Sequence, residues 1–190
     1  MLNLVFGKLE KTFRRIRSAR QQRRWTKLQS KGMQIGRKVT LPASTWIDTP
    51  HCFLISIEDN CAFGENCAIL AHDALSKLFI GTVRLSRVRI KESSRIGMGT
   101  IILPGVSVGP RSIIGAGSVV THDIPEGVVA AGNPAKVLCS LDEYLDRQRT
   151  QIESSPKFKY SLYDINNLNS DRRAQMLREL EDTDGFMIAG

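Results

Sequence analysis

An aliphatic residue recurs at every sixth position between residues 90 and 120. Ile or Val holds this position in six successive repeats, at Ile90, Ile96, Ile102, Val108, Ile114 and Val120. The residue four positions later is usually small, as at Ser94, Thr100, Val106, Ser112 and Ser118. A six-residue period fits neither a helix nor a single amphipathic strand, so it predicts an all-β solenoid in which three hexapeptides form one triangular coil. The aliphatic side chains should point inward and the small residues should fill the corners.

The same period continues upstream with two interruptions. It is present at Ile35, Leu41 and Ile47, and it resumes in a new register at Ile57, Phe63 and Ile69. The interruptions cover residues 48–54 and 72–89. Solenoids place insertions as loops on one side, often the binding side, so both interruptions are candidate sites. Two of the three histidines, His51 and His72, lie in them or at their edge.

The repeats divide the chain into residues 1–34, 35–139 and 140–190. The first segment is predicted as a basic amphipathic helix, with apolar residues three or four apart at Leu2, Val5, Phe6, Leu9, Phe13 and Ile16. The last segment is predicted as a helical extension. Ser140 and Glu143 form a capping box for a helix that ends near Glu153, and a second helix spans Ser170–Asp182, opened by Ser170. A short strand is expected over 128–131, and the last eight residues are expected to be loose.

The net charge of +8 belongs to one segment. Residues 1–31 hold ten Lys and Arg and one Glu, which leaves the remaining chain close to neutral. A nucleic-acid-binding groove is therefore not indicated. Two interpretations of the basic helix stay open: it packs on the open end of the solenoid, or residues 1–25 lie on an anionic membrane surface.

Cysteine content and hydropathy favour a cytoplasmic protein, either free or peripheral at the inner face of the membrane. Cys61 and Cys67 stand six apart in the small-residue position, which indicates buried thiols rather than a disulfide framework or metal ligands. No apolar run approaches the ~20 residues of a transmembrane helix. The N-terminus shows no signal-peptide pattern.

The segment GTIILPGVSVGPRSIIGAGSVVTHDIPEGVVAAGNPAKVL closely resembles the hexapeptide-repeat acyltransferases, most of all the branch that O-acetylates sugars and polysaccharides. The resemblance covers about residues 35–140. It implies a left-handed parallel β-helix, a homotrimer, and acetyl-CoA bound as co-substrate in a cleft between neighbouring subunits.

His72, in the run ILAHD, matches the family's catalytic histidine. The resemblance implies that it acts as a general base. It would take the proton of the acceptor while the acceptor attacks the thioester directly, without a covalent enzyme intermediate. Asp73 is a candidate for orienting the imidazole. The alternative is that His72 is a loop histidine without chemistry.

Nine residues match the family's cofactor-binding segments: Gly97, Gly99, Gly115, Ala116, Gly117, Ser118, Asn133, Pro134 and Lys136. Small residues suit a backbone that an extended thioester arm must approach closely, although the same glycines also serve as turn residues of any solenoid. Lys136 is either a phosphate partner or a solvated lysine. Three positions depart from the family pattern, namely Arg95 in place of Trp, Met98 in place of Ala and His122 in place of Lys.

These features predict an acetyl-CoA-dependent acetyltransferase that acts on a sugar hydroxyl or amino group in surface-polysaccharide or glycan synthesis. Contacts with the acceptor are expected from the two loops, with Asp48, His51 and Lys77 as candidates. An N-acetyltransferase of a nucleotide-linked amino sugar and a non-catalytic trimeric scaffold are the alternatives. No metal site is predicted, because the zinc carbonic anhydrases of this fold use closely spaced histidines and this chain has no such pair.

Overall fold

The computed structural model describes residues 22–189. The chain forms two compact units, Met1–Leu141 and Asp142–Gly190. The helix predicted from residue 1 falls largely on residues 1–21, outside the described part, and its described portion is residues 22–29.

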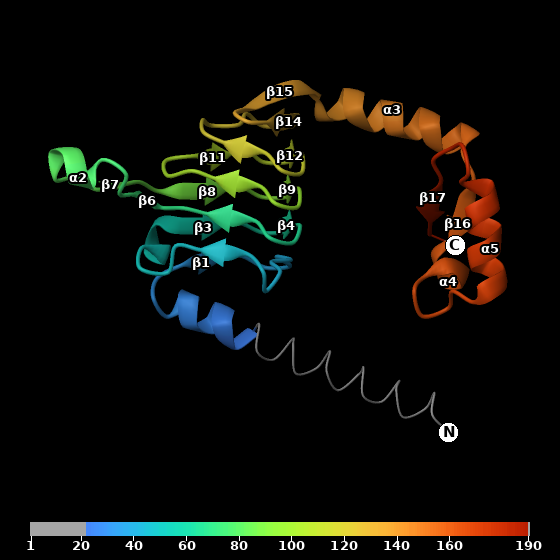
Figure 1. Cartoon of the computed structure of the whole chain (residues 1–190), viewed down its shortest axis with the longest axis horizontal. Helices are drawn as coiled ribbons and strands as arrows, with labels where there is room; N and C mark the ends of the chain where they lie inside the picture. The colour runs from blue at the N-terminus through green and yellow to red at the C-terminus, as the bar shows by residue number, and fades with distance from the viewer. Residues whose placement is uncertain (1–21, 190) are drawn as a thin grey trace. The chain divides into compact units, whose positions relative to one another are not determined.

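The first unit is a left-handed parallel β-helix whose short strands stack in successive coils (Figure 1). Its three faces are named here in the order in which the chain visits them. Face 1 contains β1 (Gln34–Ile35), β3 (Ile55–Ile57), β8 (Val88–Ile90) and β11 (Ser107–Val108). Face 2 contains β4 (Ala62–Phe63), β9 (Arg95–Ile96), β12 (Ile113–Ile114), β14 (Val128–Gly132) and β15 (Ala135–Ser140). Face 3 contains β2 (Trp46–Ile47), β5 (Ala68–Ile69), β10 (Ile101–Ile102) and β13 (Val119–Val120).

The strand register confirms three hexapeptides per coil. Ile96 pairs in parallel with Ile114, and Ile102 pairs in the same way with Val120. Each partner is therefore the aliphatic residue three repeats further along the chain. The six-residue period thus returns each aliphatic side chain to the same face one coil later.

The repeated positions form the core. The aliphatic residues at 90, 96, 102, 108, 114 and 120 are at most 3% exposed. Burying each such side chain contributes about 1.5–3 kcal/mol of transfer free energy. The small residues are equally buried, and their hydroxyls pair with backbone carbonyls: Ser94 Oγ donates to Gly109 O at 2.8 Å, and Ser112 Oγ donates to Pro125 O at 2.7 Å. These Ser side chains are therefore small enough for the corners, and they also donate hydrogen bonds to backbone carbonyls there.

The two solenoid cysteines are packing residues, as the sequence predicts. Cys61 is 0% and Cys67 1% exposed, and both are free thiols. Burial raises the pKa of each thiol. Protonated thiols in an apolar interior are poor nucleophiles and poor metal ligands, so neither residue is a candidate for catalysis.

Helical residues 22–29 close the first end of the solenoid. Trp25 and Leu28 are 8% and 4% exposed and belong to the solenoid core. The Arg24 guanidinium donates to Thr45 O at 2.7 Å. This part of the basic segment therefore packs on the open end of the solenoid, as one of the two interpretations expects. Among residues 22–189, no helix combines the length and the apolar character needed to cross a bilayer.

The long interruption is a projecting arm rather than an irregular loop. β6 (His72–Asp73) and β7 (Arg84–Leu85) pair antiparallel and carry α2 (Lys77–Ile80) at their far end (Figure 1). The short interruption contains a 3-10 turn, Cys52–Leu54. The arm exposes four large apolar side chains, with exposed fractions between 69% and 89%: Leu75, Leu78, Phe79 and Ile80.

The second unit contains the predicted helices and a small sheet that the sequence pattern does not predict. α3 spans Leu141–Ser154 and α5 spans Ser170–Glu179. Asn169 rather than Ser170 caps α5, because its Oδ1 accepts from Arg172 N at 2.9 Å. The expectation of a loose C-terminus is wrong: β17 (Phe186–Ile188) pairs in parallel with β16 (Lys157–Lys159), beside α4 (Tyr160–Tyr163). Phe158 at the centre of β16 is 2% exposed, so burial of apolar side chains holds this tail.

Candidate active site

A buried carboxylate lies against the predicted catalytic histidine. Asp48 Oδ2 is 2.5 Å from His72 Nδ1 and accepts the Ala71 backbone N–H at 3.0 Å. The Asp48 side chain is fully buried, whereas 31% of the His72 side chain is exposed. This pairing places a fixed negative charge behind one imidazole nitrogen and leaves the ring accessible from outside.

Both residues are brought together by neighbouring coils. Asp48 follows β2 and His72 opens β6 shortly after β5, and Ile47 pairs directly with Ile69 on face 3. The two side chains therefore emerge at the same corner, where face 3 turns into face 1. We call this corner 3–1.

His51 also contacts Asp48 and lies in the same turn of the chain. Its Nδ1 lies 3.3 Å from Asp48 Oδ1, and its backbone N–H donates to Asp48 O at 3.2 Å. The rings of His51 and His72 have centroids 4.8 Å apart. Two imidazoles thus share the two oxygens of one carboxylate.

The carboxylate is held in its ionised form. Burial alone would raise the pKa of Asp48, but hydrogen bonds from His72, the Ala71 N–H and His51 outweigh burial and hold that pKa below its ordinary value. An ionised carboxylate can only accept, so the Nδ1 atoms that face it carry protons. Nε2 of His72 is then unprotonated in the neutral ring, which is the tautomer that a general base requires.

Asp48, rather than Asp73, orients the imidazole. Asp73 Oδ1 instead accepts the Leu75 N–H at 2.9 Å within its own turn. The expectation that the Asp48 side chain contacts the acceptor is wrong, because that side chain is 0% exposed and both of its oxygens are paired. Asp48 and His72 are 24 residues apart, and counting coils across the insertion is the sequence signal that would have related them.

Lys77 does not join this group. It lies in α2 at the far end of the arm, where the side chains are exposed and the arm projects beyond the solenoid (Figure 1). Among described residues, the group with candidate metal-ligand atoms within 4.8 Å of one another is Asp48, His51 and His72. Its donor types suit zinc, but Asp48 already accepts three N–H groups, an arrangement that serves an oriented base.

The predicted cofactor glycines stack at a different corner, where face 2 turns into face 3. We call it corner 2–3. A Cβ on Gly97 would lie 2.4 Å from Ala116 N, and one on Gly115 would lie 2.7 Å from the Ala131 Cβ. Neighbouring coils therefore approach too closely for any side chain at these two positions.

The surface of corner 2–3 is open beside its exposed turn. Gly117 has φ +69°, and a Cβ there would meet nothing within 4 Å. Gly99 has a similar φ of +71°. Ser118 offers no side chain to this surface, because it is buried and its Oγ donates to Gly115 O at 2.6 Å and accepts Gly132 N at 3.1 Å. The glycine turns thus leave a stretch of bare backbone along the solenoid axis.

The other predicted cofactor residues lie on the hairpin that follows this corner. β14 and β15 pair antiparallel, with Gly132 opposite Ala135 and Ala131 opposite Lys136. The Asn133–Pro134 peptide bond in the turn is cis. Asn133, Pro134 and Lys136 are exposed. The Ser118–Gly132 hydrogen bond joins this hairpin to the glycine turns, so the structure brings the predicted cofactor residues together on one edge.

Two of the departures from the family pattern lie beside these turns. Met98 is 58% exposed between Gly97 and Gly99, so its side chain adds apolar surface to corner 2–3. Arg95 lies on the outside of face 2, where its guanidinium donates to the Asn60 carbonyl. His122 pairs through Nδ1 with Thr121 Oγ1 at 2.8 Å.

In one chain, face 3 separates the predicted base from the predicted cofactor turns. The outward residues of this face are in register across the strands: Trp46, Ala68, Ile101 and Val119. Trp46 is 50% and Ile101 38% exposed. The face between the two half-sites is therefore apolar.

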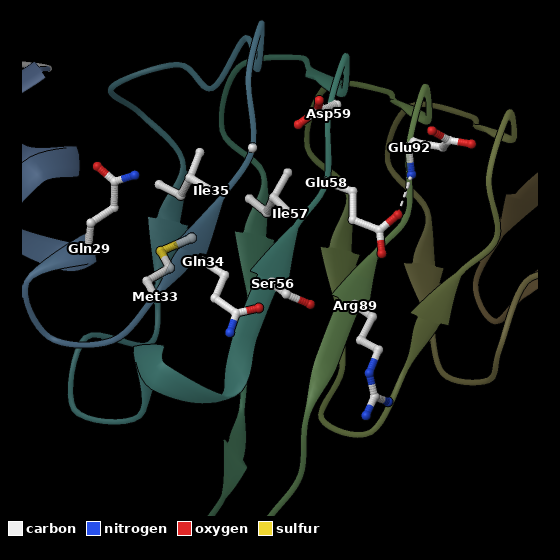
Figure 2. Close-up of a pocket in the computed structure, with 11 residues that line it drawn as sticks. Gln29, Met33, Gln34, Ile35, Ser56, Ile57, Glu58, Asp59, Arg89 and Glu92 are labelled. Atoms are coloured by element: carbon white, nitrogen blue, oxygen red, sulfur yellow. Dashed lines mark hydrogen bonds between the residues drawn. The ribbon is translucent and has the colours of Figure 1, made fainter.

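A hollow of about 760 Å³ lies elsewhere, against face 1 and the first coil (Figure 2). The side chains of Gln34, Ser56 and Arg89 line it, and Glu58 accepts the Glu92 N–H at 3.0 Å on its rim. Its lining includes neither the Asp48 group nor the glycine turns. A hydrogen-bonded polar rim without a histidine or cysteine gives no catalytic assignment, so the candidate active site stays at the corners.

Comparison with known proteins agrees with this geometry. The family described as "Bacterial transferase hexapeptide (six repeats)" matches residues 87–122, and "Hexapeptide repeat of succinyl-transferase" matches residues 54–69. The Bacillus subtilis (strain 168) protein "Putative acetyltransferase YvoF" is 30% identical over 121 residues, which cover 64% of this chain and 68% of that protein.

A solved structure shows the same fold. The hexapeptide-repeat acetyltransferase VCA0836 of Vibrio cholerae O1 biovar eltor, complexed with acetyl coenzyme A, matches with a TM-score of 0.54 and 24% identity. The match covers 58% of this chain and 61% of the Vibrio chain. Repeat register, fold and sequence similarity together lead to one conclusion: the chain belongs to the family of hexapeptide-repeat acyltransferases.

Proposed function

We propose that this protein is an acetyl-CoA-dependent acetyltransferase that acts on a sugar hydroxyl or amino group in glycan or surface-polysaccharide synthesis, with His72 as general base. The observation that carries the proposal is the 2.5 Å contact between Asp48 Oδ2 and His72 Nδ1. A buried, ionised carboxylate behind one ring nitrogen fixes the tautomer in which the other nitrogen can accept a proton. The B. subtilis relative's name, an acetyltransferase, supports the same reaction class.

The reaction follows from this geometry. His72 Nε2 takes the proton of the acceptor O–H or N–H while that oxygen or nitrogen attacks the thioester carbonyl. The carbon–sulfur bond then breaks, and the thiolate of CoA leaves with the proton that the imidazolium returns. Asp48 stabilises the transient imidazolium through the Nδ1–H hydrogen bond.

Acetyl-CoA would lie along corner 2–3. The bare backbone at Gly99 and Gly117 admits an extended thioester arm, because no Cβ blocks its approach. Ala116, Asn133 and Pro134 border the same edge, and the exposed Lys136 would pair with a phosphate of the nucleotide end. Acetyl coenzyme A bound to the Vibrio structure supports this choice of co-substrate.

A homotrimer would complete the site. Within one chain the base lies at corner 3–1 and the cofactor turns lie at corner 2–3, so a neighbouring copy would bring the missing half. The apolar outward row of face 3 and the exposed apolar tip of the arm are surfaces that such a neighbour would cover. His51 and Lys77 remain predicted acceptor contacts.

The deciding experiment measures CoA release from acetyl-CoA against a panel of sugars and nucleotide-sugars, in EDTA, for the wild type and His72→Ala. We expect acceptor-dependent release that the variant lowers by at least ~10²-fold, the scale of general-base contributions. Release of CoA with nucleotide-linked amino sugars alone would select the N-acetyltransferase alternative. No release with any acceptor, together with no acetyl-CoA binding by calorimetry, would favour the non-catalytic scaffold.

A further inference from the structure

We infer that His51 binds a second hydroxyl of the acceptor, so that the site selects acceptors that carry a vicinal diol. This inference rests on the proposed acetyl transfer, and it assigns to His51 a role separate from that of the base. It starts from the sharing of one carboxylate by two imidazoles.

Each of the two rings has its Nδ1 atom facing an oxygen of Asp48, with a closer contact for His72. His72 Nδ1 faces Asp48 Oδ2 at 2.5 Å, and His51 Nδ1 faces Asp48 Oδ1 at 3.3 Å. The centroids are 4.8 Å apart and the ring planes are inclined at 49°. Both rings are therefore held by Nδ1, next to each other, on opposite oxygens of Asp48.

Part of each ring is exposed to solvent. The side chains are 27% and 31% exposed for His51 and His72, whereas Asp48 is fully buried. Because Asp48 fixes a proton on each Nδ1, each neutral ring presents an unprotonated Nε2. The site thus offers two neighbouring hydrogen-bond acceptors to whatever approaches corner 3–1.

Only one of these acceptors is used in the proposed chemistry. His72 Nε2 takes the proton of the reacting group, and His51 Nε2 keeps its lone pair. A second O–H on the adjacent carbon of a sugar ring supplies the donor that this lone pair requires. An acceptor without that hydroxyl leaves His51 Nε2 to water, which costs a net hydrogen bond.

The size of the effect follows from exposure. Rejection by fully buried polar groups reaches 10⁴-fold or more, because such groups are left unpaired. His51 is partly exposed, so water replaces the missing hydroxyl and about 10-fold discrimination is expected. A His51 that only steadied Asp48 would instead change turnover of all acceptors by the same factor.

The test combines one substitution in the protein with the removal of one hydroxyl from the acceptor, in the manner of a double-mutant cycle. Methyl β-D-galactopyranoside, methyl β-D-glucopyranoside and methyl α-D-mannopyranoside are assayed for CoA release. The one that is acetylated is compared with its four monodeoxy derivatives. CoA release is measured for the wild type, His51→Ala and His51→Phe. The phenylalanine variant keeps an aromatic ring but has no ring nitrogen. Thermal unfolding establishes that each variant folds.

In the wild type, kcat/KM should fall about 10-fold for the derivative that lacks the hydroxyl on the carbon next to the acetylated one. In either variant, the ratio of kcat/KM for the parent sugar to kcat/KM for that derivative should fall to about 1. Acetylation at the 6-hydroxyl, whose neighbouring carbon carries no hydroxyl, would overturn the inference. A ratio that is unchanged by both substitutions would overturn the role of His51 while leaving acetyl transfer intact. If the wild type acetylates no acceptor in this set or in the wider panel, the proposed function fails and the inference fails with it.

Discussion

The carboxylate of Asp48 lies beneath the imidazole of His72, with 2.5 Å between Oδ2 and Nδ1. The same oxygen accepts the Ala71 N–H, and the other oxygen faces His51. Because the carboxylate is wholly buried, its orientation is fixed by these three donors. The orientation of the proposed base therefore depends on a residue whose side chain is buried.

Asp48→Asn should lower kcat by about 10²-fold or more at neutral pH. A single oxygen, Oδ2, accepts both the Ala71 N–H and the His72 Nδ1–H, so an amide that turns its NH₂ group toward His72 also gives up the Ala71 hydrogen bond. In that orientation Nδ1 must accept, which shifts the proton to Nε2 and removes the base; in the opposite orientation the neutral amide no longer stabilises the imidazolium. Steady-state kinetics of CoA release measure this, with thermal unfolding to show that the variant folds. Turnover within a few-fold of the wild type would remove Asp48 from the mechanism.

Asp48 should also give the fold an acid-sensitive contribution. Its hydrogen bonds place the folded-state pKa below the ordinary value, about 3.9 in an unfolded chain. The stabilisation is therefore complete above that value and is lost as the pH falls through the folded pKa. Urea unfolding at pH 6 and pH 3 should show a smaller difference between wild type and Asp48→Asn at the lower pH. An equal difference at both would contradict the assignment.

Two glycines of corner 2–3 should respond differently to alanine. Gly97→Ala should cost about 3 kcal/mol of unfolding free energy, because its Cβ would lie 2.4 Å from the backbone of Ala116. Gly117→Ala should cost only about 1 kcal/mol, since its Cβ meets open space and the cost is that of φ +69°. Gly117→Ala should raise the KM for acetyl-CoA if the cofactor passes there. Equal costs in urea unfolding would contradict the packing argument.

Charges on the apolar surfaces of the solenoid should weaken oligomerisation. Trp46→Glu on face 3 and Phe79→Glu on the arm are expected to shift the mass measured by light scattering from trimer toward monomer. CoA release should fall in parallel, because the two corners would no longer meet. Leu177→Glu is the matched control, since Leu177 is 75% exposed on α5 of the other unit. A monomeric wild type with full activity would refute the shared site.

The basic N-terminal segment should bind anionic membranes. Flotation with vesicles of phosphatidylglycerol and phosphatidylcholine is expected to recover the full chain and to lose most of it when residues 1–25 are removed. Phosphatidylcholine vesicles alone serve as the control for charge. Equal recovery of both chains would leave the segment as an end cap only, the role that Trp25 and Leu28 already have.

The hexapeptide period by itself determined the coil, its core and most of its turns. Each hexapeptide follows the same steric pattern: an aliphatic residue points inward, a small residue fills the corner, and glycine stands where neighbouring coils touch. The segments to which the proposed chemistry is assigned can also be recognised in the sequence, since His72 and the glycine turns stand in characteristic runs. Ile96 opposite Ile114 needed no information beyond the spacing.

Tertiary structure decided which of these residues meet. The interruptions at 48–54 and 72–89 depart from the six-residue spacing, so that spacing alone does not bring the Asp48 carboxylate against His72 or the His51 ring beside the His72 ring. β17 reaches β16 through burial around Phe158, which a period of six does not describe. Contacts between equivalent positions of successive coils can be predicted from the sequence, because they recur at a fixed spacing. Contacts across insertions depend on how far each loop displaces the chain, and only the folded chain fixes that distance.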